Sequence, residues 1–111
     1  MNHMNPADAR VALRLYVTGA TPSAERAKAC LKTVCDDLRR RRSESGGSPA
    51  AVDLQVIDVL SDPESATMDD VFATPTVIRV APAPTRRLFG DLSSPEMVMV
   101  GLQIAPDFAP A

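Results

Sequence analysis

The stretch ATPTVIRVAPAPTRRLFGDLSSPEMVMVGL, residues 73–102, decides the fold of this 111-residue chain, and its last part carries two opposed signals. Ser94, Pro95 and Glu96 provide the cap, the first-position proline and the first-turn acid with which many helices begin. The Met-Val-Met-Val run that follows contains two β-branched residues and ends at Gly101, which disfavours a helix interior. The local pattern of this segment is therefore compatible with a helix and with a strand.

Two strands and a long helix precede this stretch. Residues 11–17 alternate with the period of a strand, and residues 52–60 begin with the same alternation before becoming continuously apolar. The second run predicts an interior strand that is covered on both faces. Between the strands, Thr21 and Pro22 begin a helix whose apolar residues recur at spacings of three and four to about Arg41. A helix between two strands predicts that the strands are parallel.

The remaining elements complete an α/β order. An Asp-Pro-Glu sequence at residues 62–64 begins a short second helix that is expected to end near Phe72. Residues 76–80 and 86–89 have strand character and are joined by a turn stiffened by prolines. With a helical final segment, the order is β-α-β-α-β-β-α, which is that of a thioredoxin-like domain.

Length and composition limit the domain and its partners. A chain of 111 residues accommodates one domain, predicted at residues 10–104, between a flexible lead at residues 1–9 and a flexible tail at residues 105–111. The net charge of −2 gives no reason to expect nucleic acid or an anionic membrane as a partner. No apolar run approaches the roughly 18 residues that span a bilayer, and the start lacks the pattern of a signal peptide. We therefore expect a cytoplasmic protein.

The chain offers little that would support catalysis or a cofactor. Cys30 and Cys35 fall in the long helix, where an offset of five residues separates the Cα atoms by roughly 8 to 9 Å, too far for a disulfide. They are expected to be half-buried helix residues. The only histidine is His3, so no metal site is predicted. A thiol enzyme would need a cysteine near residues 19–23, where none occurs, and no glycine-rich phosphate loop follows a strand.

Much of the sequence resembles the KaiB family of circadian clock proteins. The resemblance covers about residues 11–104, and its last part aligns without gaps. The loop at residues 43–51 is longer than usual in the family, and the tail after Ile104 lacks the acidic extension of many members. The matching stretches are LRLYVTGATP at residues 13–22, LQVIDVLSDP at residues 54–63, and the whole of residues 73–102.

The resemblance implies a small non-enzymatic regulator that docks on the ring-shaped clock ATPase KaiC, with a KaiA-like protein as a further partner. It also implies two folds. In the oligomeric ground state, a dimer or tetramer, the order is β-α-β-β-α-α-β and the final segment is a strand. The monomeric state that binds KaiC is thioredoxin-like. A second hypothesis is a KaiB-like adaptor in stress or sensory signalling, without a rhythm, and a third is a thiol enzyme.

The resemblance also points to residues that contact a partner. The adjacent arginines of the fourth strand have an alternative interpretation of equal weight, as charges at a sheet edge that discourage aggregation. Without the resemblance, Asp58 and Asp91 would be ordinary acids at a strand end or turn, and Arg26 would be an ordinary exposed helix residue. The predicted partner-binding residues are Arg26, Asp58, Arg86, Arg87 and Asp91.

Five further residues are predicted to govern the change of fold: Pro75, Pro82, Pro84, Gly101 and Gln103. Gly101 costs a helix about 1 kcal/mol relative to alanine and so disfavours the thioredoxin-like state. Gln103 stands where the family usually has an aspartate, and an acid near a helix C-terminus is unfavourable by about 0.3 to 1 kcal/mol. The neutral amide is therefore expected to favour the helical end state. Pro75 is expected to stiffen the entry to the third strand, with recognition of a peptide as the alternative.

Overall fold

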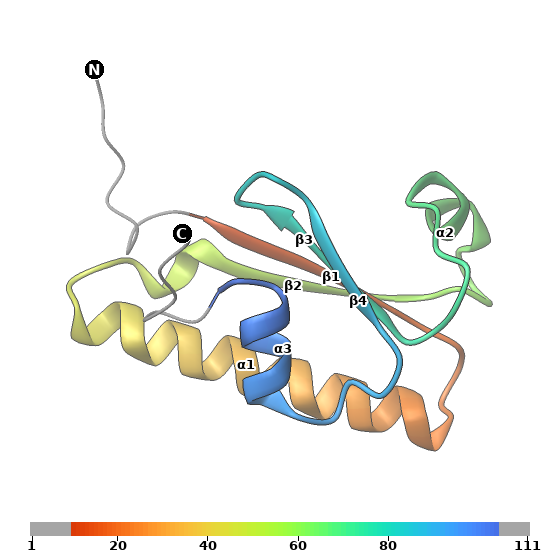
Figure 1. The fold of residues 1–111 in the computed structure, drawn as a ribbon, viewed down its shortest axis with the longest axis horizontal. Coiled ribbons are helices and arrows are strands. Elements are labelled where there is room, and N and C mark those ends of the chain that lie inside the picture. Colours follow the sequence, from red (N-terminus) through yellow and green to blue (C-terminus); the bar gives the residue numbers. More distant parts are fainter. Residues whose placement is uncertain (1–9, 105–111) are drawn as a thin grey trace.

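The computed structural model describes residues 10–104 as a four-stranded mixed sheet with helices on both faces (Figure 1). The strand order is β2-β1-β3-β4, with β1 parallel to β2 and antiparallel to β3, and β4 antiparallel to β3. The flexible lead and tail predicted for residues 1–9 and 105–111 lie outside the described residues. The elements are β1 (Val11–Val17), α1 (Pro22–Glu44), the short 3₁₀ helix η2 (Pro49–Ala51), β2 (Val52–Asp58), α2 (Pro63–Met68), β3 (Thr76–Ala81), β4 (Arg86–Phe89) and α3 (Pro95–Gly101).

The predicted thioredoxin-like order is confirmed, and the undecided final segment is a helix. Each of the three α-helices starts where the sequence predicts. The side-chain oxygens of Thr21, Asp62 and Ser94 accept a hydrogen bond from a first-turn amide, and a proline follows each of them. β1 and β2 are parallel, as predicted from the intervening helix.

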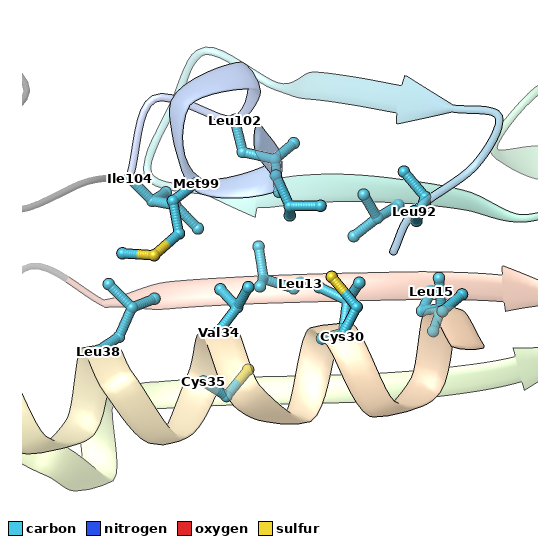
Figure 2. Close-up of a cluster of buried hydrophobic side chains, with 14 of the residues drawn as sticks. Leu13, Leu15, Cys30, Val34, Cys35, Leu38, Leu92, Met99, Leu102 and Ile104 are labelled. Carbon is cyan, nitrogen blue, oxygen red and sulfur yellow. The ribbon is translucent and has the colours of Figure 1, made fainter. Parts of the chain in front are cut away.

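Two apolar clusters lie on opposite faces of the sheet because successive strand residues point to opposite sides. The larger cluster joins β1 to α1 and α3, and Figure 2 shows Leu13, Val34 and Met99 in this layer. The smaller cluster lies under α2 and consists of Tyr16, Ile57, Ala66 and Ile78. The first face is therefore well covered, whereas a helix of only six residues packs on the second.

The prediction that the second strand is interior and covered on both faces is wrong. β2 is an edge strand, and its Asp53, Gln55 and Val56 are exposed. Ile57 and Val59 are apolar for a different reason, because both pack in the cluster under α2. The strand also ends at Asp58 rather than residue 60, since the chain turns there.

Helix α1 extends beyond the predicted end at Arg41, to Glu44. Ion pairs at helical spacing join Asp37 to Arg40 and Arg41, and the last turn adds a pair between Arg40 and Glu44. Such pairs stabilise a helix when they lie three or four residues apart. Of the four consecutive arginines at residues 39–42, Arg40 and Arg41 are exposed at this helix end, whereas Arg42 is buried.

Helix α2 ends at Met68, four residues before the predicted end near Phe72. Asp70 adopts a left-handed backbone conformation with φ 54°. The amide of Val71 donates to the Ala66 carbonyl at 2.8 Å, and the amide of Asp70 donates to the Thr67 carbonyl at 3.2 Å. These two bonds form a Schellman motif, which stops the helix.

Within residues 10–104, none of the helices has the length and apolar character needed to cross a membrane. The same residues contain no group of three or more histidine, cysteine, aspartate or glutamate side chains placed to hold a metal ion.

The two cysteines are buried in α1, not half-buried as predicted. Cys30 is 5% exposed and Cys35 is 1% exposed, and both are free thiols. Burial raises the pKa of the Cys30 thiol, with smaller contributions from Asp91 and Glu96, and raises the pKa of the Cys35 thiol to about 11. Both thiols are therefore protonated at neutral pH, which is the unreactive form.

The buried thiols are expected to resist alkylation in the folded protein. At neutral pH, iodoacetamide should modify Cys35 at least about a hundredfold more slowly than it modifies a small free thiol, because the thiolate is scarce and shielded. Mass spectrometry after timed quenching measures the rate. In denaturing guanidinium chloride both cysteines should react at the rate of the free thiol, which serves as the control. Fast alkylation of the folded protein would contradict this account and favour a thiol function.

Candidate functional site

The structure places the five predicted partner-binding residues at separate positions. Among residues 10–104, no hydrogen bond or ion pair joins any two of them. They do not form an assembled polar site of the kind that an enzyme uses. Arg26 is exposed on α1, Asp58 lies at the end of β2, Arg86 and Arg87 lie on the edge strand β4, and Asp91 is exposed in the loop before α3.

Asp58 fastens two loops to each other. Its Oδ1 atom accepts hydrogen bonds from the amides of Gly19 and Leu60, each at 3.0 Å. These backbone hydrogen bonds lower the pKa of the Asp58 carboxyl. Gly19 has φ 56°, a conformation that glycine adopts readily. Asp58 therefore joins the loop after β1 to the turn after β2, which sequence reasoning did not foresee.

The two adjacent arginines of β4 have different surroundings. Arg87 donates from Nη2 to the carbonyl of Asp69 at 2.8 Å and from Nη1 to the carbonyl of Asp70 at 3.0 Å. Its guanidinium thus binds the C-terminal end of α2. Arg86 is exposed and pairs in register with Arg79 of β3. Of the two, Arg86 leaves its guanidinium more available to a partner.

A polar cluster that sequence reasoning missed fastens α2 to β1. Tyr16 donates its hydroxyl proton to the Asp69 carboxylate, and Arg14 Nη1 lies 3.0 Å from Asp69 Oδ2. Burial raises the pKa of Tyr16 to about 12, and the hydrogen bond to Asp69 adds to the effect. Burial also tends to raise the pKa of Asp69, but the bonds from Tyr16 and Arg14 outweigh it and the pKa is lowered. The partners lie more than 50 residues apart, so no local pattern signals them.

Helix α3 presents an apolar side to the core and another to solvent. Val98, Met99 and Leu102 are buried, and Figure 2 shows Met99 and Leu102 directed toward the layer between the sheet and α1. Met97 and Val100 are 71% and 59% exposed. Exposed apolar side chains that gather on one surface often mark an interaction site.

Gly101 allows α3 to approach β4 closely. A Cβ atom at this position would lie 2.6 Å from Leu88 Cδ1 and 2.8 Å from Cδ2. These distances are too short for ordinary contact, so a larger residue requires Leu88 to move. Gly101 thus costs the helix about 1 kcal/mol relative to alanine, but it allows α3 to pack closely against Leu88.

Gln103 ends α3 through its backbone conformation, which the sequence argument about its neutral side chain did not consider. It has φ 55° and follows α3 at the position that is left-handed in a Schellman motif. The amide of Gln103 donates to the Val100 carbonyl at 3.0 Å, and the amide of Ile104 donates to the Met99 carbonyl at 2.9 Å. Aspartate tolerates this conformation better than most residues, which opposes the benefit of a neutral side chain.

The three prolines of the predicted switch set flank β3. Pro75 is buried just before the strand, whereas Pro82 and Pro84 are exposed in the turn after it. The peptide bond preceding each of the three is cis. The Pro75 carbonyl accepts a hydrogen bond from the Gly90 amide at 3.3 Å, which joins the two ends of the β3–β4 hairpin.

Arg79 is the residue that sequence reasoning most clearly missed. It is 4% exposed, and it donates to the carbonyls of Leu102 at 2.8 Å, Gln103 at 3.3 Å and Pro84 at 2.6 Å. A signal was available, because the alternation of β3 places Arg79 on the same face as the buried Val77. A cation in phase with core residues is unusual and indicates a specific role.

Similarity to known proteins shows the family of this chain. A model of the KaiB domain matches residues 14–104. The chain belongs to the KaiB family. It is 43% identical over 95 residues to a circadian clock oscillator protein KaiB of Gloeothece citriformis, covering 86% of this chain and 81% of the relative. It is 39% identical over 104 residues to a KaiB1 of Synechocystis sp., covering 94% and 90%.

Solved structures support the same fold. The N-terminal domain of Synechococcus elongatus SasA matches with a TM-score of 0.63 and 18% identity, over 98% of this chain and 97% of that domain. The Drosophila thioredoxin Deadhead matches with a TM-score of 0.54 and 15% identity, over 89% and 85%. At these identities the likeness concerns the fold alone. This KaiB family member is thus thioredoxin-like in the described arrangement.

Replacing Gly101 by alanine should have an effect that depends on Leu88. In the unaltered background, Gly101→Ala should stabilise α3 by less than the roughly 1 kcal/mol that helix propensity supplies, because Leu88 must turn away. In a Leu88→Ala background the same change should approach the full value. Native-state hydrogen exchange of the α3 amides measures both effects. Equal effects in the two backgrounds would show that the close contact has no energetic weight.

Asp58 variants should separate a structural role from a role of charge. Asparagine can retain the Oδ1 acceptor, so Asp58→Asn should keep a melting temperature within about 2 °C of the parent, whereas Asp58→Ala should lower it by several degrees. Since the folded-state pKa is lowered, the stability due to the carboxylate is present above the unfolded pKa. It should be lost as the pH falls through the folded pKa. Equal melting temperatures for the parent and the alanine variant would contradict the structural role.

Proposed function

We propose that this KaiB family member is a non-enzymatic clock regulator that binds a KaiC-type ATPase ring through its α3-ended, thioredoxin-like surface. The relatives named circadian clock oscillator protein, which match over most of the chain, support the clock role. The observation that carries the mode of binding is the final segment, which is a helix here although its sequence pattern is equally suited to a strand. Family resemblance assigns this helix-ended state to the complex with KaiC.

The same segment is proposed to be a strand in an oligomeric ground state, a dimer or tetramer. Helix α3 has seven residues, which is shorter than the roughly 12 to 15 residues that form a marginal helix in isolation. Its conformation therefore depends on packing against the rest of the domain. Association with other copies could replace that packing, and the exposed Met97 and Val100 provide apolar surface for a partner in either case.

The proposed interaction surface includes Arg26, Arg86 and Asp91, which are exposed. Arg is well suited to interfaces because its planar guanidinium forms several directed hydrogen bonds. Asp58 and Arg87 have structural bonds of their own, so their proposed contribution to binding includes holding loops in place. A KaiA-like protein is proposed as a further partner on family resemblance alone.

Binding to a KaiC-type ring tests the proposal. The full chain should be retained by the immobilised ring, and Arg26→Glu should weaken retention at least about tenfold, because reversing an interface charge replaces attraction by repulsion. Lys32→Glu is the matched control, since it reverses an exposed charge on the same helix and should change retention less than about twofold. Measurements with ATP and with a non-hydrolysable analogue show whether turnover matters.

Each outcome of this experiment bears on the proposal. Retention that is sensitive to Arg26→Glu supports it, and equal loss for both variants would show that only net charge matters. Absence of retention under both nucleotide conditions would reject the KaiC-type partner. That result would favour the second hypothesis, a KaiB-like adaptor in stress or sensory signalling.

A further inference from the structure

Arg79 binds the C-terminal end of α3 from the neighbouring strand. Its Nη1 atom lies 2.8 Å from the Leu102 carbonyl oxygen and 3.3 Å from that of Gln103. These are the carbonyls of Leu102, the C-cap residue directly after α3, and of the left-handed residue that follows it. The end of a helix carries partial negative charge and unpaired carbonyls, so a cation there is stabilising.

Arg87 binds the end of α2 in the same way, from the opposite face of the sheet. It donates to the carbonyls of Asp69 and Asp70, which are again the C-cap residue directly after the helix and the left-handed residue that follows it. Both short helices therefore end in a Schellman motif without glycine and are completed by an arginine from a strand. We call these two side chains the arginine caps.

The two arginine caps differ in their surroundings. Arg87 is exposed, so water can replace its carbonyl partners at little cost. Arg79 is 4% exposed. Among residues 10–104, its Nε atom has no hydrogen-bond partner and no carboxylate pairs with its guanidinium. A buried cation without an acid depends on the few oxygens that it reaches. The buried cap is consequently the stronger constraint.

Arg79 also bonds to a second segment. Its Nη2 atom lies 2.6 Å from the carbonyl oxygen of Pro84, in the turn between β3 and β4. The same guanidinium therefore holds this turn and the end of α3. If α3 leaves, Arg79 loses two of its three carbonyl partners, and the Pro84 carbonyl is the one that remains. A guanidinium with one partner is then better solvated by water, which competes with its bond to the turn.

We infer that the Arg79 cap regulates the final segment, because it couples the docking of α3 to closure of the turn that contains Pro84. The coupled element has two arrangements. In one, Arg79 is buried and both segments are held; in the other, Arg79 is hydrated and both are released together. The inference deepens the proposed function, since it names the residue that controls the helix-ended state. Its test requires no partner protein.

Hydrogen exchange of the full chain tests the coupling. Arg79→Lys keeps the charge but loses the planar guanidinium that reaches several carbonyls at once. The amides of Val98 to Ile104 should therefore open at least about tenfold more often, and the amide of Arg86, which begins β4 directly after the turn, should follow in parallel. Amides of β1 and α1 should change by less than about twofold. Arg87→Lys is the matched control, and its effect should be confined to α2.

The results distinguish the cap from a general stabilising role. A uniform increase of exchange across β1, α1 and α3 in the Arg79 variant would overturn the inference, as would exchange in α3 that stays unchanged. An α3 response without a response in the turn would overturn the coupling. Because no ring is present, these outcomes are independent of whether the chain binds a KaiC-type partner.

A measurement on the unaltered protein covers the case in which the Arg79 variant fails to fold. The Nε proton of Arg79 is buried and has no partner in the part of the chain that the structure describes, so it should exchange only when the cap opens. Its exchange rate, followed by NMR, should give the same opening constant as the Leu102 amide within about threefold. Fast exchange of the Nε proton alongside a protected α3 would overturn the inference.

Discussion

A buried guanidinium that has no acidic partner within residues 10–104 constrains the C-terminal half of this domain. Removing a cation from water is costly, and the cost is offset only where oxygens of good geometry surround it. Arg79 reaches three carbonyls, and these belong to the turn after β3 and to the end of α3. The position of the last helix and the shape of the hairpin are therefore linked through one side chain.

This constraint matters because α3 has little stability of its own. Its seven residues include β-branched side chains and a glycine, and an isolated helix of this length does not persist in water. Three features compensate: the close approach of Gly101 to Leu88, the local Schellman motif that brings Ile104 beside Met99, and the Arg79 cap. A segment whose structure depends on its surroundings to this degree is suited to the proposed change of fold, because all three features are lost together when the segment leaves the domain.

The surface and the thiols agree with a regulator that works by contact. Cys30 and Cys35 are buried in the core with raised pKa values, and the five family-predicted residues are dispersed instead of forming a reaction centre. Two of those residues, Asp58 and Arg87, bind backbone groups of neighbouring loops. A substitution at either would alter loop geometry as well as charge, so binding defects there have two physical origins.

The sequence by itself determined where the helices begin and the alternation of the first strand, and it made a thioredoxin-like order conditional on a helical final segment. Those features are local, because a cap residue and a following proline act within one turn. Helix ends were less predictable, since Asp70 and Gln103 stop α2 and α3 without the glycine that usually signals this motif. The edge position of β2, the choice of helix for residues 95–101 and the bonds of Arg79, Asp58 and Arg87 were decided only by the tertiary structure. Each of these depends on contacts between segments that are distant in the chain, and neither periodicity nor propensity contains that information.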